Sequence, residues 1–288
     1  MNVGIIGLGL IGGSLAKATK NFTSHRVGLW NRTHSTAVKA LEEQSGDFIL
    51  ETAEDFGQLD LMVLALYPEA TIDFVQQHLK DLRDGAVIVD TCGTKSLVCR
   101  ECQAIVSARP DLTFIGGHPM AGIEQSGYAA SHAKLFQNAS MLLVPPPDVK
   151  PAKLQTVQEF FLELGFGATK LTTAETHDRV IAYTSQLAHL VASAYIKSPT
   201  ALLHSGFSAG SFRDMTRVAY LQEAMWAELF LENQAFLLPE LNRIIDNLND
   251  FRNALEEKDE SALLRLLKEG KERKMQVNNL PEEPFSPF

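Results

Sequence analysis

The chain has 288 residues, of which 45% are hydrophobic, and its formal net charge is −9. A chain of this length has room for two domains with cores of ordinary size. The acidic balance argues against sequence-independent binding to nucleic acid or to an anionic membrane surface. No apolar run approaches the roughly 20 residues that a membrane-spanning helix needs, so we expect no membrane contact.

The cysteines Cys92, Cys99 and Cys102 are an odd and sparse set, and the N-terminus leads into a strand pattern rather than a signal peptide. Together these features predict a reduced, cytoplasmic setting. Cys99 and Cys102 have the i, i+3 spacing of one helix face, and a zinc site would need further ligands nearby. We expect no metal site.

A glycine cluster ends the first predicted strand, with the spacing Gly7-x-Gly9-x-x-Gly12. In such a turn the first glycine permits a tight bend, and the second lets the backbone approach a pyrophosphate. The third lets the following helix pack closely on the strand. The helix N-terminus adds unpaired N–H groups and the positive end of its dipole. The pattern predicts a Rossmann-type dinucleotide site.

The turn after the second predicted strand, Asn31-Arg32-Thr33, bears on cofactor preference. An NAD enzyme usually carries Asp or Glu there, which accepts from the ribose 2′-hydroxyl. Here Arg32 can pair bidentately with a 2′-phosphate and Thr33 can donate a hydroxyl. We expect NADP as cofactor, with NAD as the alternative. The expected cofactor-binding residues are Gly7, Gly9, Leu10, Ile11, Gly12, Asn31, Arg32, Thr33, Leu66 and Gly93.

Strand and helix patterns alternate over residues 1–172, which predicts an α/β fold with an N-terminal Rossmann-type, doubly wound parallel sheet. Long helical patterns over residues 173–280 predict a C-terminal all-helical domain for substrate binding and dimerisation. Residues 281–288 contain three prolines and are expected to form a tail. Strands are expected at 2–7, 26–30, 48–50, 59–66, 85–90, 112–115, 141–144 and 168–171, and the later helices at 174–197, 199–208, 216–233, 235–257 and 259–275.

A second glycine-rich segment, Gly116-Gly117-His118-Pro119, follows the strand expected at 112–115. Glycines before the histidine and a proline after it disfavour a helix. We expect a loop above the sheet that presents His118, partly accessible and with a pKa near the ordinary value, as a general base. A surface turn would use the same residue types, so this interpretation depends on the rest of the chain.

Polar clusters interrupt the helical half. His189 lies in an apolar helical pattern, and Arg213 and Arg217 lie at a predicted loop and helix start with Asp214 as N-cap. The predicted helix continues to Trp226. Arginine binds carboxylates bidentately, so the two arginines indicate an anionic substrate. For Arg213, an ion pair with Asp214 that holds the loop is the stronger alternative.

These motifs together resemble those of the prephenate/arogenate dehydrogenase family of tyrosine biosynthesis. The similarity covers about residues 1–275 and keeps the family's order. The matching segments are GLGLIGGSLA, the D-x-x-G-x-K turn from Asp90 to Lys95, GGHPMAG, LFQNA, T-S-x-L-x-H, G-x-F-R-D-x-T-R and the M-W pair before ELFLEN.

The resemblance implies oxidative decarboxylation of prephenate to 4-hydroxyphenylpyruvate. It implies that His118 is the catalytic base, that Arg217 binds a substrate carboxylate, and that the helical domain forms a homodimer. The residues expected at the substrate are Glu124, His189, Gln186, Trp226 and Arg213.

Two positions depart from the family pattern. Gly93 stands where the family often has a serine whose hydroxyl supports the catalytic histidine, and we expect Thr94, Cys92 or a water to replace it. Gln186 stands where the family has a histidine, which preserves hydrogen bonding but removes the ionisable ring. These changes bear on substrate preference more than on the type of reaction.

Three alternatives stay open at this stage. Arogenate is the nearest alternative substrate and would give tyrosine directly. A β-hydroxyacid dehydrogenase shares the domain plan and often an Asn-Arg-Thr turn, but usually relies on a lysine in the helical domain, and residues 173–196 contain none. A dinucleotide-binding sensor without turnover is conceivable from the missing serine and histidine, although the intact His118 and Arg217 argue against it.

Overall fold

The computed structural model describes residues 1–280, and the tail predicted at 281–288 lies outside the described residues. By its internal contacts the chain divides into two compact units, of which the first is Met1–Asn233 and the second begins at Gln234. The first unit contains the sheet together with the helices up to α10. The boundary predicted between residues 172 and 173 stays a prediction.

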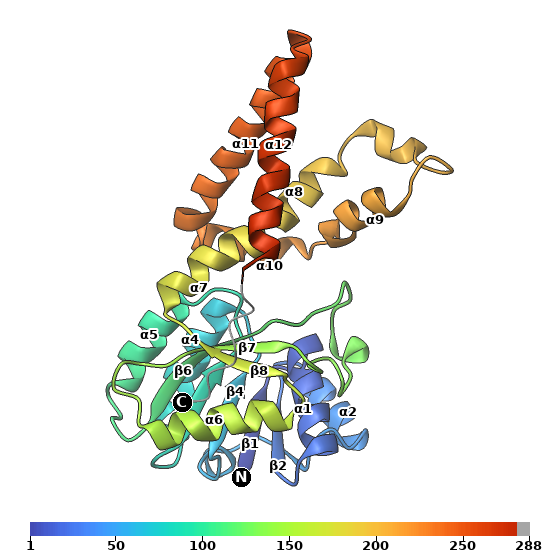
Figure 1. Ribbon diagram of the computed structural model, residues 1–288. Helices are drawn as coiled ribbons and strands as arrows, with labels where there is room; N and C mark the ends of the chain where they lie inside the picture. Colours follow the sequence, from blue (N-terminus) through green and yellow to red (C-terminus); the bar gives the residue numbers. More distant parts are fainter. Residues whose placement is uncertain (281–288) are drawn as a thin grey trace. The chain divides into compact units, whose positions relative to one another are not determined.

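Within the described residues, eight strands form one sheet in the order β3-β2-β1-β4-β5-β6-β7-β8 (Figure 1). Neighbours from β3 to β6 pair in parallel, which confirms the α/β sheet. β7 pairs antiparallel with β6, so β7 and β8 run against the others. A parallel pair needs a crossover, usually a helix, and the β6–β7 connection holds only a 3₁₀ turn, Tyr128–Ala130. The strands are β1 (Asn2–Ile6), β2 (Arg26–Trp30), β3 (Phe48–Ile49), β4 (Leu61–Leu64), β5 (Val87–Asp90), β6 (Thr113–Pro119), β7 (Ser140–Val144) and β8 (Ala168–Leu171).

Two apolar cores, one on each face of the sheet, hold this unit together. Leu15 and Phe160 belong to the core beneath α1, α2 and α6, and Phe74 and Val98 to the core beneath α4 and α5. Full burial of such a side chain stabilises the fold by about 1.5–3 kcal/mol. The helices are α1 (Leu10–Phe22), α2 (His34–Glu42), α3 (Ala53–Phe56), α4 (Pro68–His78), α5 (Ser96–Val106) and α6 (Pro151–Glu163).

The helices that follow β8 are more broken than their sequence pattern predicts. The expected helix at 174–197 contains a π-helical turn, and those expected at 199–208 and 216–233 are interrupted by 3₁₀ turns and extended residues. The Gln222 side chain accepts from the Met225 N–H and so begins a new helix there. The segments are α7 (Ala174–Ile181), the π turn Ala182–Leu187, α8 (Ala188–Tyr195), the 3₁₀ turn Pro199–Leu203, α9 (Gly210–Thr216), the 3₁₀ turn Arg217–Ala219 and α10 (Glu223–Glu232).

The second unit is a pair of packed helices, α11 (Gln234–Glu256) and α12 (Glu260–Asn278). Asp259 caps α12 by accepting from the Ala262 N–H at 2.9 Å. Both helices were predicted by the sequence pattern and are confirmed within a few residues. Among residues 1–280, none of the helices combines the length and apolarity needed to cross a bilayer.

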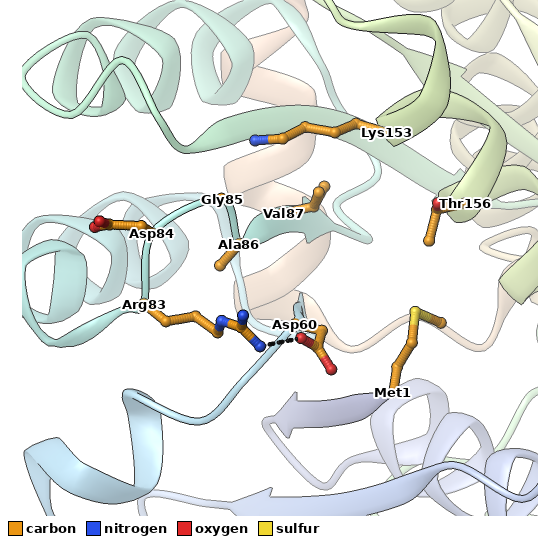
Figure 2. A pocket seen from close by; sticks show the side chains of 9 residues that line it. All are labelled: Met1, Asp60, Arg83, Asp84, Gly85, Ala86, Val87, Lys153 and Thr156. Carbon is orange, nitrogen blue, oxygen red and sulfur yellow. Dashed lines mark hydrogen bonds and ion pairs between the residues drawn. The ribbon is translucent and has the colours of Figure 1, made fainter.

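A cavity of about 570 Å³ opens near the amino ends of β4 and β5 (Figure 2). Its polar lining is already paired: Arg83 binds Asp60, and the Lys153 ammonium donates to the Asp111 carbonyl and the Thr113 hydroxyl. The glycine turn and Thr91 instead follow the carboxyl ends of their strands, where ligands bind in open α/β sheets.

Candidate active site

The glycine turn between β1 and α1 has the geometry of a pyrophosphate site. Gly7 has a φ of +88°, and a Cβ there would collide with the Ala65 carbonyl oxygen. A Cβ on Gly12 would collide with the Gly7 carbonyl oxygen, whereas no atom beyond the adjoining residues lies within 4 Å of the Cβ position of Gly9. The first turn of α1, from Leu10, has neither a side-chain cap nor an acidic residue. Open space beside free N–H groups fits a bound phosphate.

The turn after β2 lies against this site. The Asn31 side chain accepts from the Leu8 N–H at 2.9 Å and donates to the Thr33 carbonyl at 3.1 Å. Its amide therefore joins the two turns and is not free to read the ribose. Arg32 is exposed, and among the described residues its guanidinium has no hydrogen bond or ion pair. Thr33 is the N-cap of α2, but its hydroxyl makes no capping bond.

Two further predicted cofactor residues lie at neighbouring strand ends. Leu66 follows β4, and its Cδ2 atom would lie 2.7 Å from a Cβ on Gly7. Gly93 follows β5, and a Cβ there would lie 3.2 Å from the Leu229 methyl groups of α10. Leu66 is thus packed on the glycine turn, and Gly93 lies beneath α10.

His118 lies in strand β6, so the expectation that it sits on a loop was wrong. Gly116-Gly117-His118-Pro119 pairs antiparallel with β7, with His118 opposite Leu142. Glycine and proline do exclude a helix here, but β7 supplies a strand partner from later in the chain. His118 is half-buried.

His118 belongs to a hydrogen-bonded series of three side chains. Its Nδ1 lies 2.9 Å from His177 Nε2, and His177 Nδ1 lies 2.8 Å from Asp178 Oδ1. The carboxylate requires a proton on His177 Nδ1, so the neutral His177 ring presents Nε2 as an acceptor. His118 must then donate from Nδ1, which leaves a lone pair on its Nε2. No described residue bonds to that nitrogen.

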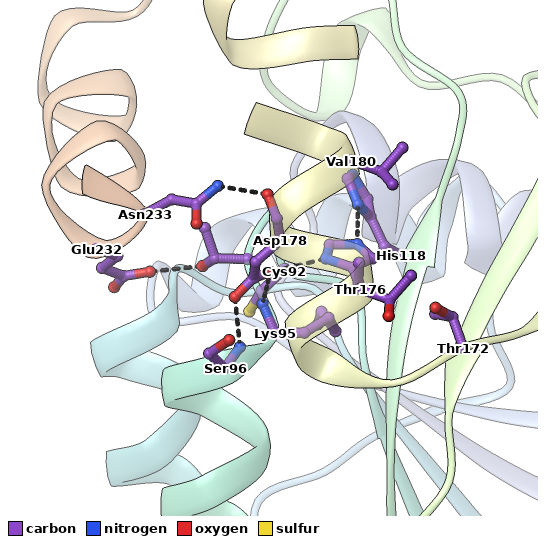
Figure 3. Close-up of polar contacts among 12 residues, drawn as sticks. Cys92, Lys95, Ser96, His118, Thr172, Thr176, Asp178, Val180, Glu232 and Asn233 are labelled. Carbon is purple, nitrogen blue, oxygen red and sulfur yellow. Dashed lines mark hydrogen bonds and ion pairs between the residues drawn. The ribbon is translucent and has the colours of Figure 1, made fainter. Parts of the chain in front are cut away.

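Asp178 holds this series at the start of α5 (Figure 3). Its Oδ1 accepts from the Lys95 N–H and its Oδ2 from the Ser96 N–H, both at 2.7 Å. His177 and Asp178 were not predicted from the sequence. An adjacent His-Asp pair at the start of a helix was the available signal, although a histidine on an apolar helix more often belongs to the core.

The replacements expected for the missing serine at position 93 do not reach His118. The Thr94 hydroxyl donates to Glu232 Oε2, and the Cys92 thiol donates to the Leu66 carbonyl. His177 makes the supporting hydrogen bond instead. The expectation for Thr94 and Cys92 was therefore wrong.

A buried ion pair lies in the turn beside the two histidines. Lys95 Nζ binds Asp90 Oδ2, and both side chains are fully buried. Asp90 also accepts from the Cys92 N–H at 2.8 Å and from the Gly117 N–H at 3.0 Å. The pair thereby joins the β5–α5 turn to the residue that precedes His118.

The pKa values of His118, His177 and Asp178 are all lower than the ordinary values of these groups. Burial, and then the nearby His177 and Lys95, hold the pKa of His118 well below its ordinary value, so the expectation of a normal pKa was wrong. Burial also lowers the pKa of His177. Although burial opposes it, hydrogen bonds from His177 and Ser96 hold the pKa of Asp178 below its usual value. Neutral imidazoles beside a carboxylate are the resting state.

Arg217 and its neighbours form a second cluster. Arg217 Nη1 binds Glu124 Oε1, and the rings of His189 and Trp226 contact each other at a tilt of 36°, with centroids 4.1 Å apart. Burial, followed by the Arg217 charge, lowers the pKa of His189. His189 Nδ1 is buried without a partner among the described residues. Arg217 and Trp226 were expected on one helix, but extended residues separate them, so that expectation was wrong.

Gln186 and Arg213 lie in different surroundings from this cluster. Gln186 is buried, donates to the Leu229 carbonyl and accepts from Asn233, so both ends of its amide are used. Arg213 is exposed, with its Nε 3.9 Å from Asp214. Asp214 lies inside α9 and Ala209 is the N-cap, so the predicted capping role of Asp214 was wrong.

The cysteines are free and buried. Burial raises the pKa of Cys99 to about 12, so its thiol stays protonated. Within the described part of the chain, no group of three His, Cys, Asp or Glu side chains is placed to hold a metal ion.

Two family models match the chain. The prephenate dehydrogenase nucleotide-binding domain matches residues 15–169, and the prephenate dehydrogenase dimerization domain matches residues 173–269. The chain belongs to the prephenate dehydrogenase family. It is an oxidoreductase of that family, and the alternatives of a β-hydroxyacid dehydrogenase or a sensor without turnover are not favoured.

Relatives of the whole chain agree with this family. A cyclohexadienyl dehydrogenase from Zymomonas mobilis is 32% identical over 284 residues, which cover 95% of each chain. The structure of Aquifex aeolicus prephenate dehydrogenase with hydroxyphenyl propionate and NAD+ has a TM-score of 0.82 at 26% identity, over 96% of this chain and 98% of that one. The Synechocystis arogenate dehydrogenase structure has a TM-score of 0.80 at 26% identity, over 96% of this chain and 100% of that one.

The lowered pKa values of His118 and His177 predict that the free energy of unfolding falls as the pH falls below the ordinary histidine pKa of about 6.5. In that range the unfolded chain takes up protons at His118 and His177, while the folded protein does not. Each such histidine then lowers the free energy of unfolding by up to about 1.4 kcal/mol per pH unit, until its folded pKa is reached.

Urea unfolding at several pH values between about 5.5 and 7.5 measures this slope. His118→Asn should flatten it by one histidine's share, whereas His204→Asn, at an exposed side chain, serves as the control. An unchanged slope in His118→Asn would contradict a neutral His118 in the folded protein.

Proposed function

We propose that the chain is a prephenate dehydrogenase of tyrosine biosynthesis that uses NADP, or NAD, to convert prephenate to 4-hydroxyphenylpyruvate and carbon dioxide. The observation that carries the proposal is the series His118–His177–Asp178, which leaves one lone pair of His118 for a substrate. The names of the relatives support prephenate as substrate. Arogenate is the second candidate, favoured by the similarity to the Synechocystis arogenate dehydrogenase.

His118 acts on the substrate's ring hydroxyl. Its Nε2 accepts the hydroxyl proton as the ring carbon that bears the hydroxyl gives up its hydride and becomes a carbonyl. The ring carboxylate then leaves as carbon dioxide, and the electron pair of the broken bond reaches the carbonyl oxygen, which takes the proton back from His118. Loss of carbon dioxide makes the ring aromatic, which drives the step forward. The positive charge that develops on His118 is stabilised through its Nδ1–H bond to His177, whose own orientation Asp178 holds.

The chain's own residues hold the cofactor and substrate. Bound nicotinamide supplies the hydride acceptor, and the glycine turn with the first turn of α1 binds its pyrophosphate. Arg217 holds a substrate carboxylate, which takes the place of Glu124 on the guanidinium. His189 and Trp226 line the same region. Gln186, in the π turn, supports this region through its hydrogen bond to the Leu229 carbonyl of α10 rather than by contact with the ring.

The helical half also supports a homodimer in the cytoplasm. The dimerization-domain match covers residues 173–269. Within that range Leu202, Leu203 and Phe207 are 88%, 73% and 93% exposed, which is unusual for large apolar side chains clustered in one segment. A second copy of the chain would cover them. The three free thiols favour a reducing compartment.

One assay tests the reaction. The purified chain is given prephenate or arogenate, each with NAD or NADP, while nicotinamide absorbance and carbon dioxide release are followed. We expect turnover with prephenate and release of one carbon dioxide per cofactor reduced. Turnover with arogenate but not prephenate would select the second candidate, and no turnover with any of the four pairs would refute both.

Arg32→Ala should weaken NADP binding while leaving NAD binding nearly unchanged. Arg32 is exposed in the turn after β2, and only the 2′-phosphate of NADP would bind its guanidinium. Loss of a hydrogen-bonded charge costs about 1.5–3 kcal/mol, which is roughly a tenfold to hundredfold rise in Kd. Fluorescence titration with both cofactors measures this, with exposed Arg100→Ala as the matched control. Equal affinity of the unmodified protein for NAD and NADP would contradict the preference.

His118→Asn should reduce kcat by about 10²–10⁴-fold because asparagine has similar reach but cannot take the proton. Its cofactor Kd should not change, since His118 lies outside the glycine turn. Steady-state kinetics with the preferred pair, together with cofactor titration, check both parts. If the variant kept more than about a tenth of the original kcat, a loss below about 1.4 kcal/mol, another residue such as His189 would be the base.

A further inference from the structure

Burial of the Asp90–Lys95 ion pair requires two charged groups to lose their hydration on folding. Both side chains are fully buried, and removal of each charge from water costs several kcal/mol. Among residues 1–280, Asp90 is the hydrogen-bond partner of the Lys95 ammonium. Apolar residues of similar volume would often be at least as stable at such a site.

Strand β6 also makes room for this pair. A Cβ on Gly116 would lie 3.2 Å from Lys95 Cδ and 2.5 Å from Cys99 Sγ, and a Cβ on Gly117 would collide with the Asp90 carbonyl oxygen. Two consecutive glycines weaken a strand, because they contribute no packing and lose more backbone entropy on folding. The backbone just before His118 thus lies directly on the Lys95 stem.

Lys95 is linked to both halves of the histidine pair. Through Asp90 it reaches the Gly117 N–H, which precedes His118, and its own backbone N–H donates to Asp178 beside His177. The groups whose charges act on His118 are His177 and Asp178 of α7 and Lys95 of the β5–α5 turn, while Asp90 also acts on His177. The nearby thiols of Cys92 and Cys99 are buried and protonated.

We propose that Lys95 is a positioning residue whose clamped ammonium keeps the His118–His177 pair uncharged, so that His118 retains the lone pair with which it accepts the substrate proton. A second positive charge in this enclosed space is repelled by the first. Asp90 keeps the ammonium charged and in place, since it raises the pKa of Lys95 although burial opposes it. The inference rests on the proposed function of His118 as proton acceptor.

Histidine-selective NMR titration of the full chain tests the proposal, with the His118 signal assigned from the His118→Asn spectrum. In Lys95→Gln the midpoint of His118 should rise by about one pH unit or more, a tenfold gain in proton affinity. The double variant Asp90→Asn/Lys95→Gln removes both charges but keeps polar side chains. In this variant the midpoint of His118 should still rise. Lys153→Gln, at a half-buried lysine bonded to Asp111 and Thr113, is the control and should shift nothing.

The pH dependence of kcat/KM provides a second readout, whose acid limb should move upward with the NMR midpoint. An unshifted His118 midpoint in the double variant would show that the pair only holds the fold. If the variants do not fold, the unmodified protein still tests the proposal: a His118 midpoint at or above about 6.5 overturns it, and one well below upholds the uncharged pair on which it depends. If the variants shift the His118 midpoint but the unmodified protein shows no turnover, the proposed function is refuted. The effect of Lys95 on the charge of the histidine pair then still stands.

Discussion

The placement of one carboxylate, that of Asp178, governs the rest of the site. It is 2% exposed and accepts from the backbone at the start of α5, where the helix dipole also favours a negative charge. Because it fixes the proton on His177 Nδ1, it also fixes which nitrogen of His118 is free. The tautomer of a strand residue is thus set by a helix start elsewhere in the chain. Without Asp178, the buried N–H of Lys95 and the half-buried N–H of Ser96 would lose their acceptor, at about 1–3 kcal/mol for a fully buried group.

The polar network that begins at Asp178 extends to α10. The Asn233 amide donates to the Asp178 carbonyl at 2.9 Å and to Gln186 Oε1 at 2.7 Å, and Gln186 donates to the Leu229 carbonyl. Asn233 and Gln186 are 1% and 2% exposed, so each bond lies in a low-dielectric interior where an unpaired group would be costly. Gln186 lies in the π turn, a distortion frequent at functional sites. These hydrogen bonds thereby join α7 and α10 to the start of α5.

Local patterns predicted most of the first unit, because its strands, helices and glycine turn depend on neighbours in sequence. His118 was misplaced because glycine and proline exclude a helix without distinguishing a loop from a strand, and its partner β7 comes later in the chain. His177 was missed because its role depends on His118, 59 positions away. The break between Arg217 and Trp226 contains no glycine or proline, so only the capping bond of Gln222 reveals it. Partners distant in sequence decided the cases of His118 and His177, and a local capping bond decided the third.

The two departures from the family pattern meet at one residue of α10. A side chain at Gly93 would place its Cβ 3.2 Å from the Leu229 methyl groups, a tight contact that glycine avoids. Gln186 donates to the Leu229 carbonyl at 3.1 Å, so the position that lacks the family's histidine holds the same segment of α10. His177 meanwhile bonds to His118 Nδ1 and so gives His118 the support that the serine was expected to give. Both departures therefore bear on the packing of Leu229, and the proposed proton acceptor His118 keeps a hydrogen-bonded neighbour without either of them.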